Sequence, residues 1–339
     1  MLKNIFNKLK KIIKEEYKSI IFFVILYIIF MWPLNYYIIT GGGIMKIGNR
    51  IVVEDGYSSK GSFNLAYVNE AKGTIATYLL SYVIPNWERI EASSYTYDDE
   101  ETINDIEFRG KIDLEQASSN AIKNAFLEAG KTYKVISDNL YVYYVDKDST
   151  NSFKVGDKIL KVDDKKIKNV EEFHDVLENY SEGEEIKILV ERNNKEKELT
   201  TELYSQNGKN ILGIYVSEVE KFKTYPKVTI KFKSSESGPS GGLMEALDIY
   251  NKITEKDLTK GLKIAGTGEI DKDGNIGTIG GVKYKLLGAE KENATIFFTP
   301  KGENYKTCIK EKKKNNLKIK VVGVSTLKEA IDFLKNYQD

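Results

Sequence analysis

The chain has 339 residues, a length typical of about two domains. Its 51 lysine and arginine residues balance 50 acidic residues, so the net charge of +1 gives no global attraction for nucleic acid. One histidine and one cysteine exclude an intrachain disulfide and make histidine-based catalysis, thiol-based catalysis and a zinc site difficult. We therefore expect no metal, no cofactor and no nucleic-acid partner.

Residues 19–39 form an uncharged apolar stretch that is long enough for a helix to cross a membrane. Residues 1–18 are rich in lysine, which predicts a cytoplasmic N-terminus, a transmembrane helix and an extracellular remainder at the cell membrane. A cleaved signal peptide is the alternative, but residues 39–43 match a cleavage site poorly. We expect Gly41–Gly43 to end the helix and to begin a short linker.

Residues 44–130 are predicted to be an ordered exterior segment. Its expected elements, in chain order, are strands at 51–53 and 63–68, a short helix at 75–83, an acidic solvated loop at 98–107 and a helix at 113–130. Asp113 and Gln116 have the spacing of a capping box, and Gly130 is a typical helix terminator.

Residues 131–205 contain an apolar strand pattern at 140–145, the phrase Val-Gly-Asp-Lys-Ile-Leu-Lys-Val at 155–162 and an amphipathic helix at 170–177. This order resembles bacterial PDZ domains. The resemblance implies that a peptide binds by adding as a strand to a domain edge, near Asn139, Leu140 and Tyr141. A glycine-rich carboxylate-binding loop is not obvious there, so capture of a peptide C-terminus is left open, as is a plain spacer role.

Within residues 206–339, a predicted strand at 228–232 is followed by Gly238-Pro239-Ser240-Gly241-Gly242 and then by an apolar helical pattern. The glycines allow backbone amides to approach a bound carbonyl, and a helix N-terminus favours developing negative charge. Alone, the motif is equally typical of any strand-to-helix turn or of a phosphate-binding turn.

Two further segments follow the serine motif in the sequence, namely Thr267-Gly268-Glu269-Ile270 and Ile279-Gly280-Gly281-Val282-Lys283-Tyr284-Lys285. Together with the serine motif, these segments resemble the Lon protease catalytic domain, over about residues 226–334. The resemblance implies Ser240 as nucleophile, Lys285 rather than Lys283 as base, and Thr267 as the residue that orients the lysine. Gly238 and Gly241 would support the oxyanion site.

An unperturbed lysine is protonated at neutral pH, so Lys285 must be buried to act as a base. Many Lon proteins carry an acidic residue three positions before the serine, whereas this chain carries Ser237. No Gly-x4-Gly-Lys-(Ser/Thr) loop is present, so we expect an ATP-independent enzyme that acts on peptides or unfolded proteins.

The whole arrangement resembles the membrane-anchored PDZ-Lon serine proteases of Gram-positive bacteria. The expected fold class is α+β, with a transmembrane helix, a PDZ-like β-rich module and a Lon-type α/β domain. The expected activity is endopeptidase cleavage of extracytoplasmic proteins through a Ser-Lys dyad and an acyl-enzyme. A non-catalytic PDZ receptor with an inert Lon fold is the alternative, a phosphate-binding protein is a third hypothesis, and a homo-oligomer is left open.

Overall fold

The computed structural model describes residues 2–147, 149, 151–206 and 208–338, with side chains from residue 13 onward except at residue 209. These residues divide into two compact units. The smaller unit comprises residues 1–41 and 68–97, and the larger one comprises residues 42–67 and 98–339. Strands β1 and β3 contribute residues to both units.

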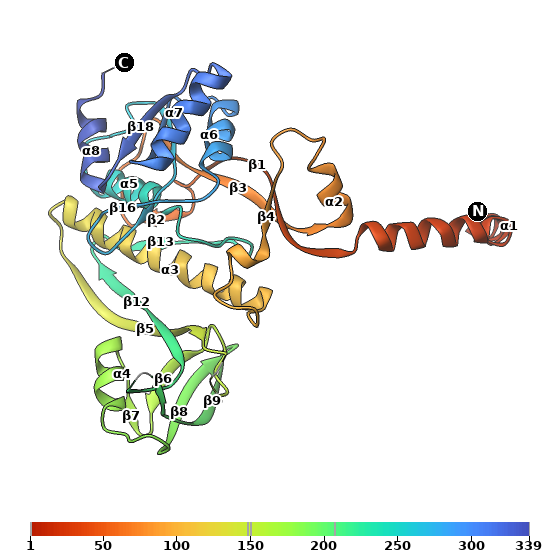
Figure 1. Ribbon diagram of the computed structural model, residues 1–339. Coiled ribbons are helices and arrows are strands. Elements are labelled where there is room, and N and C mark those ends of the chain that lie inside the picture. The colour runs from red at the N-terminus through yellow and green to blue at the C-terminus, as the bar shows by residue number, and fades with distance from the viewer. Residues whose placement is uncertain (1, 148, 150, 207, 339) are drawn as a thin grey trace. The chain divides into compact units, whose positions relative to one another are not determined.

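Figure 1 shows the helices and strands. The helices are α1 (Leu2–Phe30), α2 (Ile75–Leu80), α3 (Ile103–Glu128), α4 (Val170–Leu177), α5 (Gly242–Ile253), α6 (Val282–Lys291), α7 (Glu303–Asn315) and α8 (Leu327–Asn336), with a 3₁₀ turn at Ala92–Ser94. The strands are β1 (Pro33–Lys46), β2 (Ile51–Val53), β3 (Ser62–Thr74), β4 (Glu88–Glu91), β5 (Tyr133–Val145), β6 (Lys158–Val162), β7 (Lys165–Lys166), β8 (Glu185–Arg192), β9 (Lys195–Glu202), β10 (Tyr204–Gln206), β11 (Lys209–Ile211), β12 (Ile214–Thr224), β13 (Val228–Ile230), β14 (Lys263–Gly266), β15 (Glu269–Ile270), β16 (Ile276–Gly277), β17 (Ile296–Pro300) and β18 (Lys320–Val324).

The predicted membrane span at 19–39 is not one helix. Helix α1 ends at Phe30, and β1 begins at Pro33, which cannot continue a helix because its ring clashes with the preceding turn. Residues 36–39 pair with β4, and Ile38 and Ile39 are buried. In the part of the chain that the structure describes, no helix is both long enough and apolar enough to cross a membrane.

The glycine linker predicted at Gly41–Gly43 is wrong, because these residues continue strand β1. Helix α6 comes close to the strand at this point. A Cβ atom on Gly288 would lie 2.8 Å from the carbonyl carbon of Gly42. Small residues on both sides therefore allow the helix and the strand to approach each other closely.

Helix α3 is longer than predicted and begins inside the segment that was expected to be an acidic loop. Its N-cap is Thr102, which forms the capping box with Asp105. The box expected at Asp113 and Gln116 is wrong, since both residues lie in the middle of the helix. The sequence pattern missed this start because residues 103–112 carry charged side chains between their apolar ones. Gly130 follows the helix with a φ of 64°, as expected for a helix terminator.

The first sheet of the larger unit has the strand order β18-β17-β14-β3-β1. Strand β14 is parallel to β3 and β17, and β17 is parallel to β18. Alternate strand residues face opposite sides of the sheet. Ile264 packs in one buried core with α5 and α8, whereas Ala265 packs in another with α6 and α7. Helices therefore cover both faces of the sheet (Figure 1).

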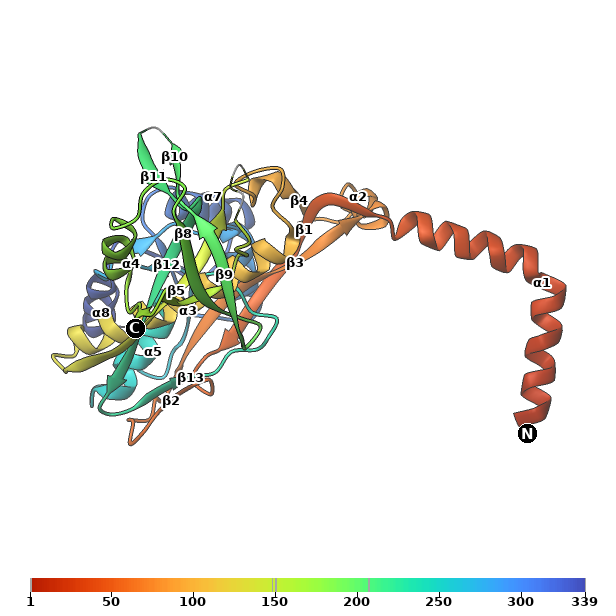
Figure 2. The same ribbon diagram turned by 90° about the horizontal axis from the view of Figure 1, so that it is seen from below.

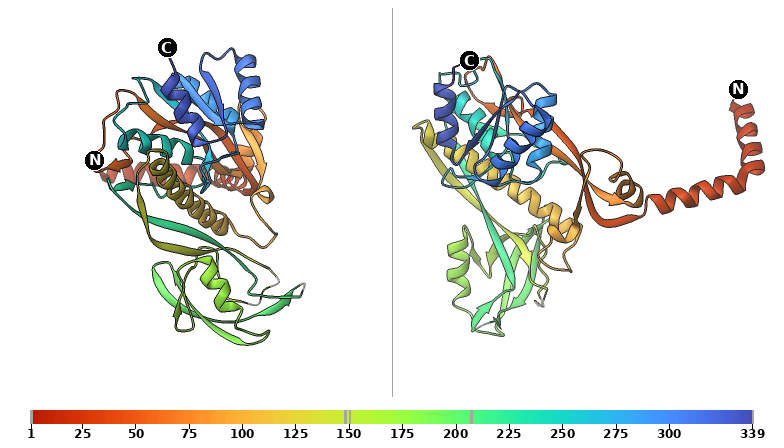
Figure 3. Two further views of the ribbon diagram at one scale, coloured as in Figure 1. Left: turned by 90° about the vertical axis from the view of Figure 1, so that its left-hand side faces the viewer. Right: turned by 45° about the horizontal axis from the view of Figure 1, so that its top comes forward.

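The second sheet has the order β12-β5-β6-β8-β9, with β7 paired to β6, and it encloses a separate core with helix α4. The hairpin of β10 and β11 projects from this part of the chain (Figure 2). Helix α3 lies between the second sheet and helix α5 (Figure 3, left). Its residues Ala121, Ala125 and Phe126 are fully buried in the core that contains α5.

Candidate active site

Ser240 lies in the turn between strand β13 and helix α5 and is partly buried. Gly241 is the N-cap of α5, so Ser240 immediately precedes the positive end of the helix dipole. The helix is anchored by Leu243 and Leu247, which are fully buried. The nucleophile candidate therefore stands at the N-terminus of a helix that the core holds in place.

Thr267 joins the serine turn to the parallel sheet. It follows strand β14 and is fully buried, and its N–H donates to Phe298 O of β17 at 3.0 Å. Its Oγ1 donates to the backbone oxygen of Ser240 at 3.1 Å, and the N–H of Gly268 donates to the same oxygen at 2.9 Å. The serine backbone is thus bonded directly to the residues that follow β14.

Lys285 reaches the same point from helix α6. Its side chain is buried, and its Nζ donates to Thr267 Oγ1 at 3.2 Å. Burial among apolar neighbours disfavours the charged amine and lowers the pKa of Lys285 to about 8. Lys283 is only half-buried, and its Nζ lies 5.0 Å from the centre of the Tyr284 ring. Of the two lysines, Lys285 has the environment that a general base requires.

Gly238 does not offer its amide to a substrate in this structure. Its N–H donates to Gly110 O of helix α3 at 2.7 Å, and Gly242 N–H donates to Pro239 O at 3.2 Å. Among the described residues, the N–H groups of Ser240 and Gly241 have no protein acceptor. The amide of Gly238 therefore holds the turn against helix α3 and does not support the oxyanion site as predicted. The amide of Gly241 is a free donor beside Ser240.

The residues predicted to bind a peptide lie in the middle of the second sheet. Leu140 and Tyr141 of β5 pair with β12 on one side and with β6 on the other. Leu140 is buried in the core, and Tyr141 Oη donates to Glu115 Oε2 of α3 at 3.2 Å. A peptide cannot add as a strand beside Leu140 and Tyr141, because both of their edges are occupied, so the predicted position is wrong at these two residues. Asn139 pairs with Val219 of β12 and remains a prediction.

Comparison with known proteins gives two family matches. Residues 128–203 match the PDZ domain, and residues 227–334 match the Lon protease (S16) C-terminal proteolytic domain. The chain combines a PDZ domain with a Lon-type proteolytic domain. The second match spans Ser240, Thr267 and Lys285.

Two Lon proteases resemble part of this chain. The chain is 36% identical over 96 residues to the Lon protease of Aster yellows witches'-broom phytoplasma (strain AYWB), which covers 28% of this chain and 12% of the relative. It is 33% identical over 99 residues to the Lon protease of Mesomycoplasma hyopneumoniae (strain 232), which covers 29% and 11%. The chain therefore spans about one eighth of the length of these relatives.

A solved structure is similar to part of the chain. The PDZ domain of an SdrC-like protein from Listeria monocytogenes is 26% identical, with 24% of this chain and 92% of that structure covered, at a TM-score of 0.23.

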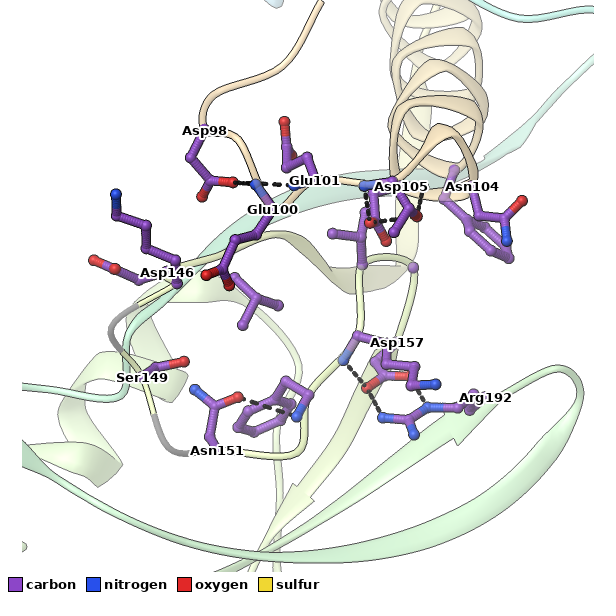
Figure 4. A pocket seen from close by; sticks show the side chains of 18 of the residues that line it. Asp98, Glu100, Glu101, Asn104, Asp105, Asp146, Ser149, Asn151, Asp157 and Arg192 are labelled. Carbon is purple, nitrogen blue, oxygen red and sulfur yellow. Dashed lines mark hydrogen bonds and ion pairs between the residues drawn. The ribbon is translucent and has the colours of Figure 1, made fainter. Parts of the chain in front are cut away.

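A cavity of about 570 Å³ lies between the start of α3 and the loops of the PDZ domain (Figure 4). Its carboxylates are largely engaged within the protein. Asp98 Oδ1 accepts the N–H groups of Glu100 and Glu101, and Asp157 accepts two hydrogen bonds of 2.6 Å from Arg192. Ser240, Thr267 and Lys285 do not line this cavity, so it is separate from the candidate active site.

Two residues that often carry chemistry are placed away from the site. Cys308 is buried in helix α7, and burial raises the pKa of its thiol. His174 is exposed on helix α4 of the PDZ domain. Within the described part of the chain, no three histidine, cysteine or carboxylate residues are arranged to hold a metal ion.

Sequence reasoning missed the contribution of helix α3 to this site. Gly110 and Ser118 of this helix contact the serine turn and the first turn of α5. One signal was available, since Ser118, Ser119 and Asn124 are polar residues that lie buried among the apolar residues of this helix. Buried polar groups require partners, which indicates a contact surface that is more than apolar packing.

Proposed function

We propose that this protein is an ATP-independent serine endopeptidase in which Ser240 is the nucleophile and Lys285 is the general base. The observation that carries the proposal is the buried amine of Lys285, whose hydrogen bond to Thr267 Oγ1 links it to the backbone of Ser240. A lysine with a lowered pKa can accept a proton from a serine hydroxyl near neutral pH.

In the proposed reaction, Ser240 Oγ attacks the carbonyl carbon of the scissile peptide bond while Lys285 Nζ takes the hydroxyl proton. The oxyanion forms beside the free N–H groups of Ser240 and Gly241, at the N-terminus of α5. The protonated Lys285 then gives its proton to the leaving amine, which leaves an ester on Ser240. Water, deprotonated by Lys285, hydrolyses this ester and regenerates the serine.

Thr267 would fix the direction of the lysine. The Thr267 hydroxyl donates a hydrogen bond to Ser240 O and accepts one from Lys285 Nζ. The hydroxyl therefore acts as donor and as acceptor at the same time. No carboxylate among the residues that the structure describes shifts the pKa of Lys285, and burial is the cause of its lowered pKa. An amine of this kind is held ready for proton transfer by position and desolvation.

The activity and its base are tested together by a pH profile. The purified full chain in detergent, without ATP, should hydrolyse casein with a rate that rises about tenfold per pH unit below pH 8 and levels off above it. The sign follows because the neutral form of Lys285 is the active one, and raising the pH populates it. The absence of cleavage at every pH would reject the proposed function, and a rate that falls between pH 7 and pH 9 would reject Lys285 as the base.

The expected substrates are peptides and unfolded proteins. The sequence carries no Gly-x4-Gly-Lys-(Ser/Thr) phosphate-binding loop that would support ATP-driven unfolding. A substrate strand must therefore already be accessible when it reaches Ser240.

We further propose that the PDZ domain receives the peptide at the outer edge of β12 around Val216, before Glu218 and Glu220, whose backbone oxygens accept hydrogen bonds from helix α3. Strand β12 is the outermost strand of the sheet and lies beside helix α4. Glu218 Oε2 of β12 accepts the N–H of Val170, the first residue of α4, at 2.8 Å. Ile214 and Val216 of β12 and Leu177 of α4 are partly buried apolar residues next to the core. An exposed strand edge beside apolar side chains suits the addition of a peptide as a further strand.

This peptide site can be tested through the backbone groups of β12 that point away from β5. The oxygens of Glu218 and Glu220 point away from β5, toward α3, and the alternation along the strand gives Val216 the same orientation. In an inactive Ser240→Ala background, Val216→Pro should weaken binding of fluorescein-labelled casein about fivefold, since it removes one outward N–H. Val216→Ala keeps that N–H and is the control. Equal affinity in the proline and alanine variants would place the peptide elsewhere.

We also propose that the N-terminal segment holds the protein at a membrane, with the N-terminus cytoplasmic and the protease outside. Support comes from the apolar side chains of residues 20–32, which are nearly all exposed, including Phe23 at 64% and Tyr27 at 65%. Such a run is unfavourable in water. Protease added to intact cells should digest the chain from outside, whereas digestion only after lysis would contradict this orientation.

A further inference from the structure

Helix α3 is bonded to β12, the edge strand of the second sheet. Gln116 Nε2 donates to Glu218 O at 3.2 Å, and Ser119 Oγ donates to Glu220 O at 2.6 Å. Both acceptors belong to β12, the strand that leads through β13 to the serine turn. One side of α3 therefore holds the strand that enters the Lon-type domain.

The same helix is bonded to both halves of the candidate active site. Gly110 O accepts the N–H of Gly238, two residues before Ser240, at 2.7 Å. Asn120 Nδ2 donates to Ile270 O at 3.0 Å, and Asn124 Nδ2 donates to Asp271 O at 2.9 Å. These two acceptors follow closely after Thr267. The turn that carries the serine and the segment that follows the threonine are thus tied to one rigid element.

Gly110 is the point at which the serine turn comes closest to the helix. A Cβ atom at this position would lie 3.0 Å from the Cβ atom of Ser237. This separation is tighter than ordinary contact between carbon atoms, so a side chain here would push the turn away. The glycine interrupts a helix in which alanine would be the better helix former, which leaves close approach as its evident purpose.

A second contact secures the turn from the other end. Ser118 Oγ donates to Glu245 Oε2 at 2.6 Å, and both residues are buried. Glu245 lies in the first turn of α5, and its Oε1 lies 3.4 Å from the place where a side chain on Gly241 would begin. The carboxylate therefore packs against the residue that directly follows Ser240.

We propose that Gly110 is a positioning residue for the reaction at Ser240, acting through its carbonyl bond to Gly238 and through the absence of a side chain. The proposal rests on the proposed peptidase function. Gly110 touches no reacting atom. Its effect is to set where the serine turn stands relative to Thr267 and Lys285, which reach the site from the parallel sheet and from α6.

The test is Gly110→Ala in the full chain. We expect kcat for casein peptides to fall on the order of tenfold, with KM little changed, because a displacement of a few tenths of an ångström misaligns Ser240 with its base. The thermal unfolding midpoint should not fall, because alanine favours the helix. Adding Ser237→Gly removes the Cβ atom that the new methyl group would meet, and this double variant should recover most of the lost kcat. Glu107→Ala, an exposed change one turn earlier in α3, should match the wild type.

A Gly110→Ala enzyme with wild-type kcat would overturn the proposal, as would a loss that Ser237→Gly fails to restore. A second readout does not depend on activity. The Gly238 amide should exchange slowly with deuterated solvent in the wild type and faster in Gly110→Ala, and equal exchange would also overturn the proposal. If the wild-type protein cleaves nothing while the exchange rates differ as expected, the proposed peptidase function fails and the placement of the turn by Gly110 stands.

Discussion

Ser240→Ala should lower casein hydrolysis at least about a thousandfold, since removal of a nucleophile eliminates the covalent pathway. The fold should persist, because the turn is held through the backbone oxygen of Ser240, which bonds to Thr267 and Gly268. The measurement is the rate of peptide release at pH 8.5, where Lys285 is largely neutral.

The matched control for this change is Ser235→Ala, an exposed serine in the same turn. It should retain the wild-type rate. Without a nucleophile, the residual rate should lie far below about a tenth of the wild-type rate. A Ser240→Ala variant that retains more than this would show that another residue performs the attack.

Lys285→Met should cause a loss of similar size, on the order of a thousandfold, because the serine then lacks a group to accept its proton. Methionine resembles the lysine stem in length and is apolar, so the buried site loses an amine that is costly to bury. The thermal unfolding midpoint should therefore stay the same or rise.

Lys283→Met separates the two neighbouring lysines. Lys283 is half-buried and lies against the Tyr284 ring, away from the hydrogen bond to Thr267. This variant should keep nearly full activity. A large loss in Lys283→Met together with an active Lys285→Met would reverse the assignment of the base.

The sequence predicted the central elements of the Lon-type domain well because their signals are local. Helix α5 shows a helical repeat of apolar residues, and the glycines around Ser240 mark its start. The place in the motif favours Lys285 over Lys283, and the structure gives the physical difference between them, namely the burial of Lys285. Helix α4 of the PDZ domain has the predicted bounds.

Contacts between distant segments could not be predicted in the same way. Strand β12 covers the outer edge of β5 although β6, β8 and β9 come between them in the chain. The resemblance to PDZ domains places the peptide near Asn139, Leu140 and Tyr141, but Leu140 and Tyr141 lie inside the sheet, between β12 and β6. The bond from Gly238 to Gly110 likewise joins residues that no local pattern connects.

The start of α3 and the end of α1 were missed for a different reason. Thr102 and Asp105 form a capping box, but the run of acidic residues around them is equally typical of a solvated loop. Residues 33–39 are apolar and uncharged, so they extend a membrane-like pattern, yet their aromatic and β-branched side chains favour a strand. Pairing with β4 determines the outcome.

Detection of a covalent intermediate on Ser240 tests the proposed nucleophile most directly. The full-length enzyme would be mixed with a peptide ester, quenched in acid within the first turnover and digested, and the fragment containing Ser240 would be weighed by mass spectrometry. We predict that this fragment carries the mass of the acyl group, and that Lys285→Met forms the adduct far more slowly. Cleavage of the ester by an enzyme that carries the acyl group on another residue, or on none, would contradict the assignment of Ser240 as the nucleophile.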